Sequence, residues 1–598
     1  MTERVPLRDY VAEVRTVGKV LGRFVRYRPS SKRNVTELLE GHAKAHPART
    51  ALVFEDERFS YAQWNERANR VAHWARRQGL RHGDVVALLM DNRPEYLFVW
   101  SGLAKLGVVT ALLNTNLTGP MLDHALAAAH TTRIIVGAEL AGQLATASSP
   151  PPAWVLADRG VPVPPGARDL DRELEAMPSG NPDPRVRATL RAGDDLFYIY
   201  TSGTTGNPKA ARFSHLRFLA IGDVVSLFTD TTDADVLYDV LPLYHTAGGV
   251  MVPAVCLHSG ATLVLRRRFS ASHFWEDVRR HQVTGFQYIG ELCRYLLSQP
   301  PGPRDRDHRV RFAVGNGLRP DVWPAFRDRF RIPRIHEFYG STEGNVTLMN
   351  LDNEVGAVGR ALLPITNARI VRYEVEAGRH PRDREGFCIE AAPGEIGEAI
   401  GRLPFSKRMA VGRFEGYTSD ADSEAKVLRN VFRKGDAWFR TGDLLRQDAR
   451  GYFYFVDRIG DTYRWKGENV STQQVAELLG PFPGLHMANV YGVEVPGAEG
   501  RAGMAALLLH DGASFEAKPF YELVTERLPT YAKPAFVRVQ TQADLTGTFK
   551  LRKVDLQKQG FDPSVIDEPL FVRHDAERTY VKVTPEVYEE IRAGRWVL

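Results

Sequence analysis

The segment YIYTSGTTGNPKAA, residues 198–211, holds the densest group of side chains suited to chemistry in this 598-residue chain. An apolar run leads into a loop of glycine, serine and threonine residues that ends at a lysine. Backbone N–H groups in such a loop form a nest for an anion, hydroxyls donate hydrogen bonds, and the lysine adds positive charge. We therefore predict a phosphate-binding loop made of Thr201, Ser202, Gly203, Thr204, Thr205, Gly206 and Lys209.

The loop differs from the Walker A phosphate loop, because it has no Gly-Lys-[Ser/Thr] triplet and Pro208 precedes the lysine. A hydrophilic surface turn is the alternative interpretation. A run of six small or hydroxylated residues, the last of which begins the sequence Gly-x-Pro-Lys, is too particular for a plain turn.

Five further segments follow the loop: LPLYHTAGG (241–249), FYGSTEGN (338–345), FRTGDL (439–444), VDRIGDTYRWKGENVS (456–471) and LTGTFKLRK (545–553). With the loop, they resemble the motifs of the acyl-adenylate-forming superfamily, in the order in which that family has them. The variants GNGLRP (315–320), YRWKGENVST and TGTFK resemble its fatty-acid transport protein, or very-long-chain acyl-CoA synthetase, branch. The resemblance covers nearly the whole chain.

The resemblance implies a site for ATP and Mg²⁺. The carboxylate of Glu343 and a hydroxyl such as that of Thr201 supply hard oxygen ligands, which Mg²⁺ prefers. Thr342 is implied to contact a phosphate. Without its motif, Glu343 would be interpreted as a solvated surface charge.

The nucleoside is implied to bind through two other segments. An aromatic ring and close-approaching backbone would enclose the adenine, and the resemblance assigns them to Tyr339, Gly315, Asn316 and Gly317. The carboxylate of Asp443 can accept two hydrogen bonds from the ribose hydroxyls, and Arg458 would contact ribose or phosphate. The alternatives are a core tyrosine, a turn aspartate and a surface ion pair.

Three more residues are implied to serve the reaction itself. Negative charge gathers on the phosphates as a carboxylate attacks the α-phosphate, and Lys550 would stabilise it as a positioned cation. His245 would lie near the carboxylate of the acid, and Gly467 would let the pantetheine arm of coenzyme A pass. The alternatives are a solvated basic run around Lys550 and a core histidine at 245.

The implied activity is that of a long-chain fatty-acid–CoA ligase with two half-reactions, through an acyl-AMP intermediate. A small domain would rotate about Gly460, where many family members have Asp or Lys. Two rival functions are an acyl-AMP ligase that loads a carrier protein and a fatty-acid uptake protein that acts by thioester trapping. A nucleotide-binding regulator with a dead site is a third, which the complete motif set disfavours. Aromatic acids and sterol side-chain acids stay open as substrates.

The elements around these motifs predict an α/β fold. Helices alternate with short β runs from about residue 35 to 360, which indicates parallel sheets covered by helices. We expect a large N-terminal domain (1–457) with a strand-rich subdomain at 386–456, a hinge at 458–461, and a small mobile α+β C-terminal domain (462–598). An apolar stretch at 97–113 is expected to be a buried core helix, because it is too short and polar to span a membrane.

Composition sets the broad class. The chain is 43% hydrophobic and 25% charged, with net charge +6 and no basic stripe interleaved with aromatic residues, so we expect no nucleic-acid partner. Three widely spaced cysteines indicate core residues of a reduced compartment rather than disulfides or a zinc site. The first residues, MTERVPLRDY, lack an apolar h-region, so we expect no secretory signal and a cytoplasmic protein. Peripheral membrane binding through a basic amphipathic helix at 10–25 is an open alternative to packing of that helix on the main domain, and a homodimer is also left open.

Overall fold

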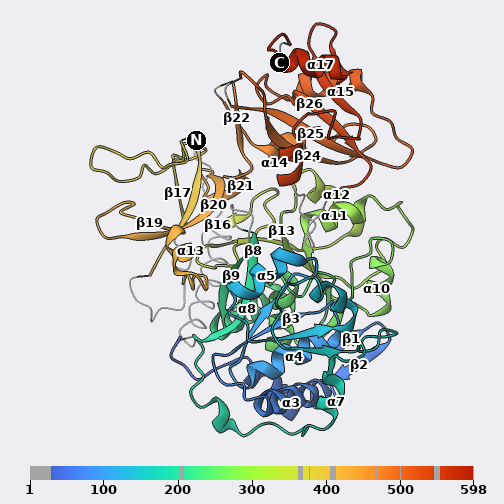
Figure 1. The fold of residues 1–598 in the computed structure, drawn as a ribbon, viewed down its shortest axis with the longest axis vertical. Helices are drawn as coiled ribbons and strands as arrows, with labels where there is room; N and C mark the ends of the chain where they lie inside the picture. Colours follow the sequence, from blue (N-terminus) through green and yellow to red (C-terminus); the bar gives the residue numbers. More distant parts are fainter. Residues whose placement is uncertain are drawn as a thin grey trace. The chain divides into compact units, whose positions relative to one another are not determined.

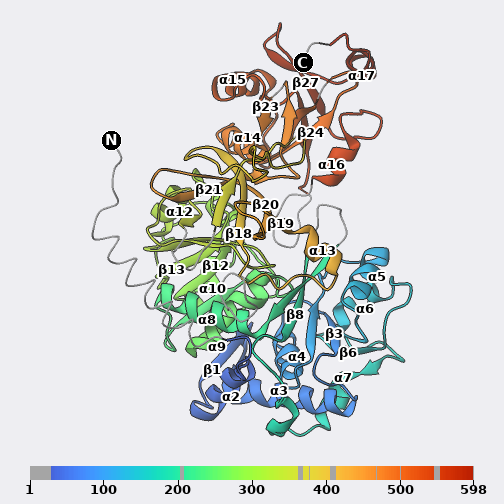
Figure 2. The same ribbon diagram turned by 90° about the vertical axis from the view of Figure 1, so that its left-hand side faces the viewer.

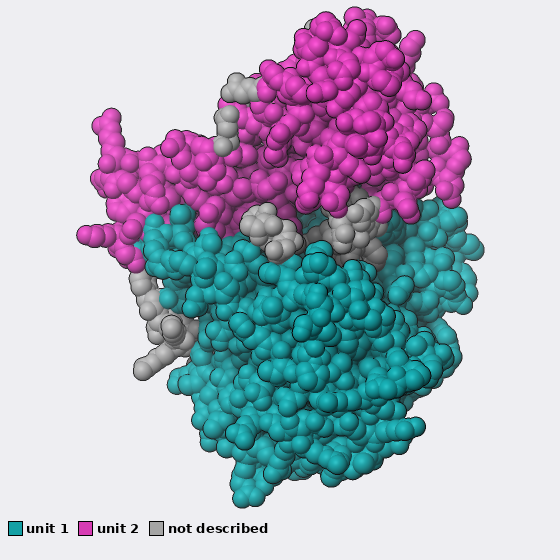
Figure 3. All heavy atoms as spheres, viewed as in Figure 1, with its two compact units in different colours: residues 1–368, 401–429, 436–439 teal, residues 369–400, 430–435, 440–598 magenta. Residues whose placement is uncertain are grey.

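A computed structural model describes residues 28–202, 208–360, 368–375, 377–404, 413–466, 468–498, 500–543, 553–596 and 598. The chain forms two compact units (Figure 3). Unit 1 comprises Met1–Ala368, Gly401–Arg429 and Asp436–Phe439, and unit 2 comprises Arg369–Ile400, Asn430–Gly435 and Arg440–Leu598. The boundary at 457 and the hinge at 458–461 stay predictions.

One sheet of unit 1 carries the two ends of the predicted phosphate-binding loop. Its strand order is β7-β6-β5-β3-β4-β8-β9, with every pair parallel except β8 and β9. The strands are β3 (Val85–Leu89), β4 (Val109–Leu112), β5 (Arg133–Gly137), β6 (Ala153–Leu156), β7 (Arg168–Asp169), β8 (Asp195–Ser202) and β9 (Pro208–Ser214). The parallel core agrees with the expected alternation of strands and helices.

A second sheet of unit 1 runs in the order β16-β15-β14-β13-β12-β10-β11-β1-β2. Its central strands, from β14 to β1, are parallel. The strands are β1 (Thr50–Phe54), β2 (Glu57–Ser60), β10 (Val236–Asp239), β11 (Thr262–Leu265), β12 (Gly285–Ile289), β13 (Phe312–Asn316), β14 (Ile335–Gly340), β15 (Thr347–Asn350) and β16 (Gly359–Arg360). In the same unit β19 (Val427–Arg429) pairs with the start of β20 (Ala437–Gln447).

Helices cover these sheets (Figures 1 and 2). They are α2 (Thr36–Ala45), α3 (Tyr61–Arg77), α4 (Pro94–Ala104), α5 (Gly119–Ala128), α6 (Ala141–Leu144), α7 (Leu170–Glu175), α8 (His215–Thr229), α9 (Val252–Ser259), α10 (Phe274–Arg280), α11 (Gly290–Leu297), α12 (Val322–Phe330) and α13 (Asp420–Ala425). Short helical turns are η1 (Ala138–Leu140), η2 (Pro184–Arg187) and η3 (Thr246–Met251).

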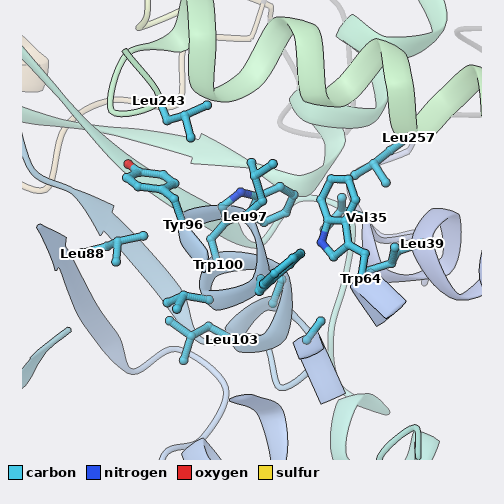
Figure 4. Close-up of a cluster of buried hydrophobic side chains, with 14 of the residues drawn as sticks. Val35, Leu39, Trp64, Leu88, Tyr96, Leu97, Trp100, Leu103, Leu243 and Leu257 are labelled. Atoms are coloured by element: carbon cyan, nitrogen blue, oxygen red, sulfur yellow. The ribbon is translucent and has the colours of Figure 1, made fainter. Parts of the chain in front are cut away.

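The core of unit 1 fills the space between helices and sheets. Trp64, Trp100 and Leu97 from α3 and α4 meet Leu88 of β3 and Leu257 of α9 in one buried cluster (Figure 4). Burying large apolar side chains is the main stabilising term of such a core. Helix α3 presents one apolar face to this core, whereas α4 is buried on nearly all sides.

The prediction of a buried helix over residues 97–113 is wrong for the second half of that range. Helix α4 ends at Ala104, a turn follows, and β4 occupies Val109–Leu112. Gly107 has a φ of +70°, which suits glycine and turns the chain back toward the sheet. A continuous apolar run does not distinguish a buried helix from a buried strand.

Unit 2 holds the remaining strands and a separate core. The first group is most of β17 (Ala368–Val371), of β18 (Ile396–Arg402) and of β20, with β21 (Tyr452–Arg458). A hairpin of β22 (Tyr463–Trp465) and β23 (Glu468–Val470) follows. A five-stranded sheet follows, with β24 (Leu485–Glu494), β25 (Arg501–Leu509), β26 (Phe536–Gln540), β27 (Leu570–His574) and β28 (Thr579–Lys582). Its helices are α14 (Thr472–Leu479), α15 (Ala517–Arg527), α16 (Val554–Gln559) and α17 (Pro585–Arg592).

The α/β class is confirmed, including the strand-rich segment and the mixed C-terminal part. The cysteines Cys256, Cys293 and Cys388 are all buried, as expected of core residues. In the described ranges, no helix has the length and apolarity needed to cross a membrane.

Candidate active site

The two ends of the predicted phosphate loop lie side by side. Strands β8 and β9 are antiparallel and place Thr201 opposite Lys209. The ammonium group of Lys209 is 2.7 Å from a carboxylate oxygen of Asp422 on α13. Ser202 is the last residue of β8, and Gly203, Thr204, Thr205 and Gly206 lie outside the described residues.

A tyrosine that sequence analysis did not single out joins the two predicted metal ligands. The hydroxyl of Tyr417 donates a hydrogen bond to Oε1 of the buried Glu343, and it also shares a side-chain hydrogen bond with Thr201. The backbone of Tyr417 forms a β-bridge with Ala211 of β9, which sets its position. Glu343 and Thr201 are therefore neighbours in space although 142 residues separate them in the sequence.

The predicted phosphate contact and the histidine segment also meet. The hydroxyls of Thr246 and Thr342 are 3.1 Å apart, within hydrogen-bonding distance. Thr246 begins η3, directly after His245, whose half-buried ring lies 4.5 Å from that of Tyr244. The structure thus brings His245 and Thr342 into one neighbourhood of unit 1.

Arg217 supports this neighbourhood from α8. Its guanidinium donates to the backbone oxygen of Thr342 at 2.8 Å, stacks over the Phe213 ring at 4.2 Å, and lies 3.9 Å from Glu415. Burial lowers the pKa of Arg217, while the charges of Glu415 and Glu343 act in the opposite direction. Arg217 therefore holds the Thr342 segment in place. The one indication of this role in the sequence was that Arg217 is the single arginine of an otherwise largely apolar helix.

Glu337 organises the segment that the resemblance assigns to adenine. Its Oε1 accepts hydrogen bonds from the backbone N–H groups of Gly317 and Leu318, the latter at 3.2 Å. Its Oε2 accepts one from the hydroxyl of Tyr288 at 2.5 Å. Burial raises the pKa of Glu337 to about 8, although these donors favour the ionised form. The local sequence HEFY (336–339) gave no indication of this role for Glu337.

The other predicted adenine residues lie close by. Gly315 and Asn316 end β13, and a β-carbon on Gly315 would lie 2.2 Å from the backbone oxygen of Tyr288, so that position tolerates only glycine. Tyr339 is 8% exposed on the neighbouring strand β14. Their contacts with adenine stay predictions.

The predicted ribose residues lie together in unit 2. Asp443 of β20 is the cross-strand partner of Arg458 on β21, and Oδ1 of Asp443 is 3.9 Å from Nε of Arg458. The residue before Asp443, Gly442, has a φ of +80° and donates its N–H to Oε1 of the fully buried Glu398 at 3.1 Å. Glu398 also contacts His380 at 2.7 Å and Arg440 at 3.0 Å. Glu398 is thus a further support that the sequence did not reveal.

Two predicted residues, Lys550 and Gly467, lie outside the described residues. The ammonium group of the neighbouring Lys553 donates hydrogen bonds to the carboxylate of Asp461 at 3.2 Å and to the hydroxyl of Thr472 at 2.7 Å. Lys553 therefore has a structural role, which distinguishes it from the predicted catalytic lysine.

Two largely parallel sheets covered by helices, with Thr201 at the start of a glycine- and hydroxyl-rich sequence and joined through Tyr417 to the buried Glu343, define a nucleotide-binding α/β enzyme. The chain belongs to the AMP-binding enzyme family, whose sequence model matches residues 39–396.

Relatives and solved structures agree with this assignment. Long-chain fatty acid transport protein 6 of Mus musculus is 42% identical over 559 residues, covering 92% of this chain and 89% of the relative. An anthranilate CoA ligase bound to anthranoyl-AMP shares the fold, with a TM-score of 0.73, 21% identity and coverage of 88% of this chain and 97% of that one. So does an O-succinylbenzoate–CoA synthetase of Bacillus subtilis bound to ATP and magnesium, with a TM-score of 0.69, 23% identity and coverage of 88% and 99%.

Proposed function

We propose that this AMP-binding enzyme is a long-chain fatty-acid–CoA ligase. ATP and the fatty acid give acyl-AMP and pyrophosphate, and coenzyme A then gives acyl-CoA and AMP. The name of the 42%-identical relative supports a long-chain fatty acid as substrate. The CoA ligases that share the fold support the acceptor.

One observation carries the proposal: Tyr417 connects Thr201 to Glu343 while Thr246 connects His245 to Thr342. The residues proposed to bind phosphate, metal and the acid carboxylate thereby form one cluster in unit 1. Transfer of the adenylyl group from ATP to the acid carboxylate, with release of pyrophosphate, requires these three groups close together, because proximity of the reactants supplies much of the rate.

The cluster fits a bound Mg²⁺. Oε1 of Glu343 accepts the Tyr417 hydroxyl, and Oε2 has no hydrogen-bond partner among the described residues. Within the described ranges, no group of three or more His, Cys, Asp or Glu side chains forms a dedicated metal cage. Mg²⁺ usually binds through one or two carboxylates together with substrate phosphates and water, so Glu343 and Thr201 suffice. When bound, the ion would neutralise charge on the phosphates.

The acyl chain is proposed to enter unit 1 between α8, α9 and the second sheet, where the packing leaves an apolar cavity of about 10 Å³ that would have to widen as the chain enters. Phe286 lines this cavity, together with Val225, Met251, Val255 and Phe312. The π-helix η3, which begins directly after His245, ends at Met251 on the cavity wall. An acid held by its carboxylate at His245 would extend its hydrocarbon along this helix.

The remaining roles come from the C-terminal residues. Lys550 would neutralise charge in the adenylation step, Asp443 and Arg458 would bind the ribose, and Gly467 would admit coenzyme A after rotation about the hinge at 458–461. No protein nucleophile is needed, because the acyl-AMP anhydride is already activated.

A product assay tests the proposal. Purified protein is supplied with MgATP, coenzyme A and fatty acids of graded length, and AMP and acyl-CoA are measured. Acyl-CoA formation that peaks at long chains is the expected result. Acyl-AMP without thioester would instead identify an acyl-AMP ligase, and no adenylation of any acid would refute the activity.

Uptake of fatty acids would follow from thioester formation, since acyl-CoA is trapped where it is made. A cytoplasmic location, peripheral membrane contact through residues 10–25, and a homodimer accompany this proposal as predictions. Residues 10–25 lie outside the described residues.

A further inference from the structure

Asn92 lies just beyond the carboxyl end of β3, in the sheet that carries the two ends of the predicted phosphate-binding loop. Its side chain reaches residues 241–243, which follow β10 of the second sheet. The amide Nδ2 donates to the backbone oxygens of Leu241 at 2.8 Å and of Arg266 at 3.2 Å. The amide Oδ1 accepts from the backbone N–H of Leu243 at 2.8 Å. Asn92 thereby links the two sheets of unit 1.

The orientation of this amide is fixed by its partners. An asparagine amide has two N–H donors and one carbonyl acceptor, and here the donors face two carbonyl oxygens while the acceptor faces an N–H. The reversed amide would turn its oxygen toward two other oxygens. Asn92 is buried, so a side chain that lacks the amide would leave buried backbone groups without partners.

The main chain beside Asn92 is itself held in place. The neighbouring Arg93 is buried and donates to the backbone oxygens of Leu156 at 3.2 Å and of Ala157 at 2.5 Å, at the end of β6 in the same sheet. Its guanidinium also lies 3.3 Å from the carboxylate of Asp158. The amide of Asn92 is therefore presented from a fixed point of the first sheet.

Residues 241–243 lie directly against the turn that carries His245. The backbone N–H of His245 donates to the backbone oxygen of Pro242 at 3.2 Å. A β-carbon on Gly248 of η3 would lie 2.5 Å from the backbone oxygen of Leu241, which is also an acceptor of the asparagine amide. No side chain fits between η3 and this backbone, so a displacement of residues 241–243 moves the turn as well.

We propose that Asn92 is a positioning residue for the adenylation step, which holds the turn of His245 and Thr246 beside the sheet of the phosphate-binding loop. The inference rests on the proposed acid–CoA ligase function, in which His245 meets the acid carboxylate. Asn92 acts through the backbone of residues 241–243. Because the hydroxyl of Thr246 is 3.1 Å from that of Thr342, the same contact also sets the neighbour of the proposed phosphate ligand.

The test replaces Asn92 by leucine, which keeps the approximate size and removes all three hydrogen bonds. A displacement of about 1 Å can lower a rate about 100-fold, so we expect kcat/KM for the acid to fall by about 10- to 100-fold. KM for the acid should rise more than KM for ATP, because the adenine and ribose are proposed to bind to other segments. Asn92→Ala is the second variant, and it removes the same bonds without an added branched side chain.

Hydrogen–deuterium exchange of the backbone amides in residues 241–249 gives a readout that does not depend on activity. It is measured on the full-length natural protein and on each variant. The N–H of Leu243 loses its acceptor in both Asn92 variants, so exchange in this segment should become faster.

Asn69→Leu is the matched control. Asn69 is a buried asparagine of α3 in the same unit, and its Nδ2 donates to the backbone oxygen of Ser179 at 2.7 Å. Its replacement should lower thermal stability and leave both KM for the acid and the exchange of residues 241–249 unchanged, because Ser179 belongs to a different loop.

The outcomes separate this inference from the proposed function. If KM for the acid and KM for ATP rise together, or if Asn69→Leu raises KM for the acid equally, Asn92 has only a general structural role and the inference is wrong. Unchanged exchange in residues 241–249 of both Asn92 variants would also overturn it. If the natural protein converts no acid, the ligase function fails, and the exchange measurement alone decides whether Asn92 holds the turn.

Discussion

The hydroxyl of Tyr417 donates a hydrogen bond to the carboxylate of Glu343, across 74 residues of sequence. Burial raises the pKa of the Tyr417 hydroxyl, and the negative charge of Glu343 raises it further. The hydroxyl therefore stays protonated, and a hydrogen-bond donor, at every working pH. The carboxylate is thereby held in one orientation.

Tyr417→Phe tests this arrangement. Loss of a hydrogen bond to a charged group should lower kcat/KM for ATP about 10-fold and raise the Mg²⁺ concentration needed for half-maximal activity. Steady-state kinetics over a Mg²⁺ titration measure both. Tyr200→Phe is the control, because its hydroxyl binds Ala125 O at 2.6 Å, elsewhere in the same unit. An equal Mg²⁺ shift in both variants would contradict a specific role for Tyr417.

Lys550→Ala should abolish formation of acyl-AMP and spare thioester formation from supplied acyl-AMP, because its charge is required only while charge gathers on the phosphates. Pyrophosphate release and acyl-CoA formation measure the two half-reactions separately. Lys553→Ala, which loses contacts with Asp461 and Thr472, should mainly lower thermal stability. Equal loss of both half-reactions in Lys550→Ala would refute the assignment.

Glu337→Gln should change how stability depends on pH. Burial raises the pKa of Glu337 from 4.5 to about 8, so the folded chain binds this proton more tightly than the unfolded chain. The free energy of unfolding of the natural protein should therefore fall as pH rises from about 5 to about 8. A neutral glutamine lacks this term, so the variant should gain stability relative to the natural protein as pH rises. Denaturant unfolding across this pH range checks it, and parallel pH profiles would contradict it.

Glu398→Ala should disturb the segment before Asp443. Leaving His380 and Arg440 without their buried partner should cost about 3 kcal/mol of unfolding free energy. Since Gly442 also loses its acceptor, KM for ATP should rise more than kcat falls. Glu374→Ala is the control: it breaks an exposed ion pair with Arg379 and should change neither quantity measurably. A variant with normal KM would show that the Glu398 contact does not position the ribose segment.

Local sequence determined the fold class and the order of the motifs. Strand β8 and the loop that follows could be read from an apolar run that ends in glycines and hydroxyls, and α3 from apolar residues at helical spacing. The same reasoning failed at 97–113, because an apolar run lacks the periodicity that separates α4 from β4.

The supporting residues were decided by tertiary structure alone. Arg217 reaches Thr342 across 125 residues, and Tyr417 reaches Glu343 across 74. Asn92 reaches Leu241 across 149 residues. Spacing along a chain predicts only contacts within one element, because a residue's neighbours across elements depend on strand order and register. The sequence therefore predicted which groups perform the chemistry, and the fold decided which groups hold them in place.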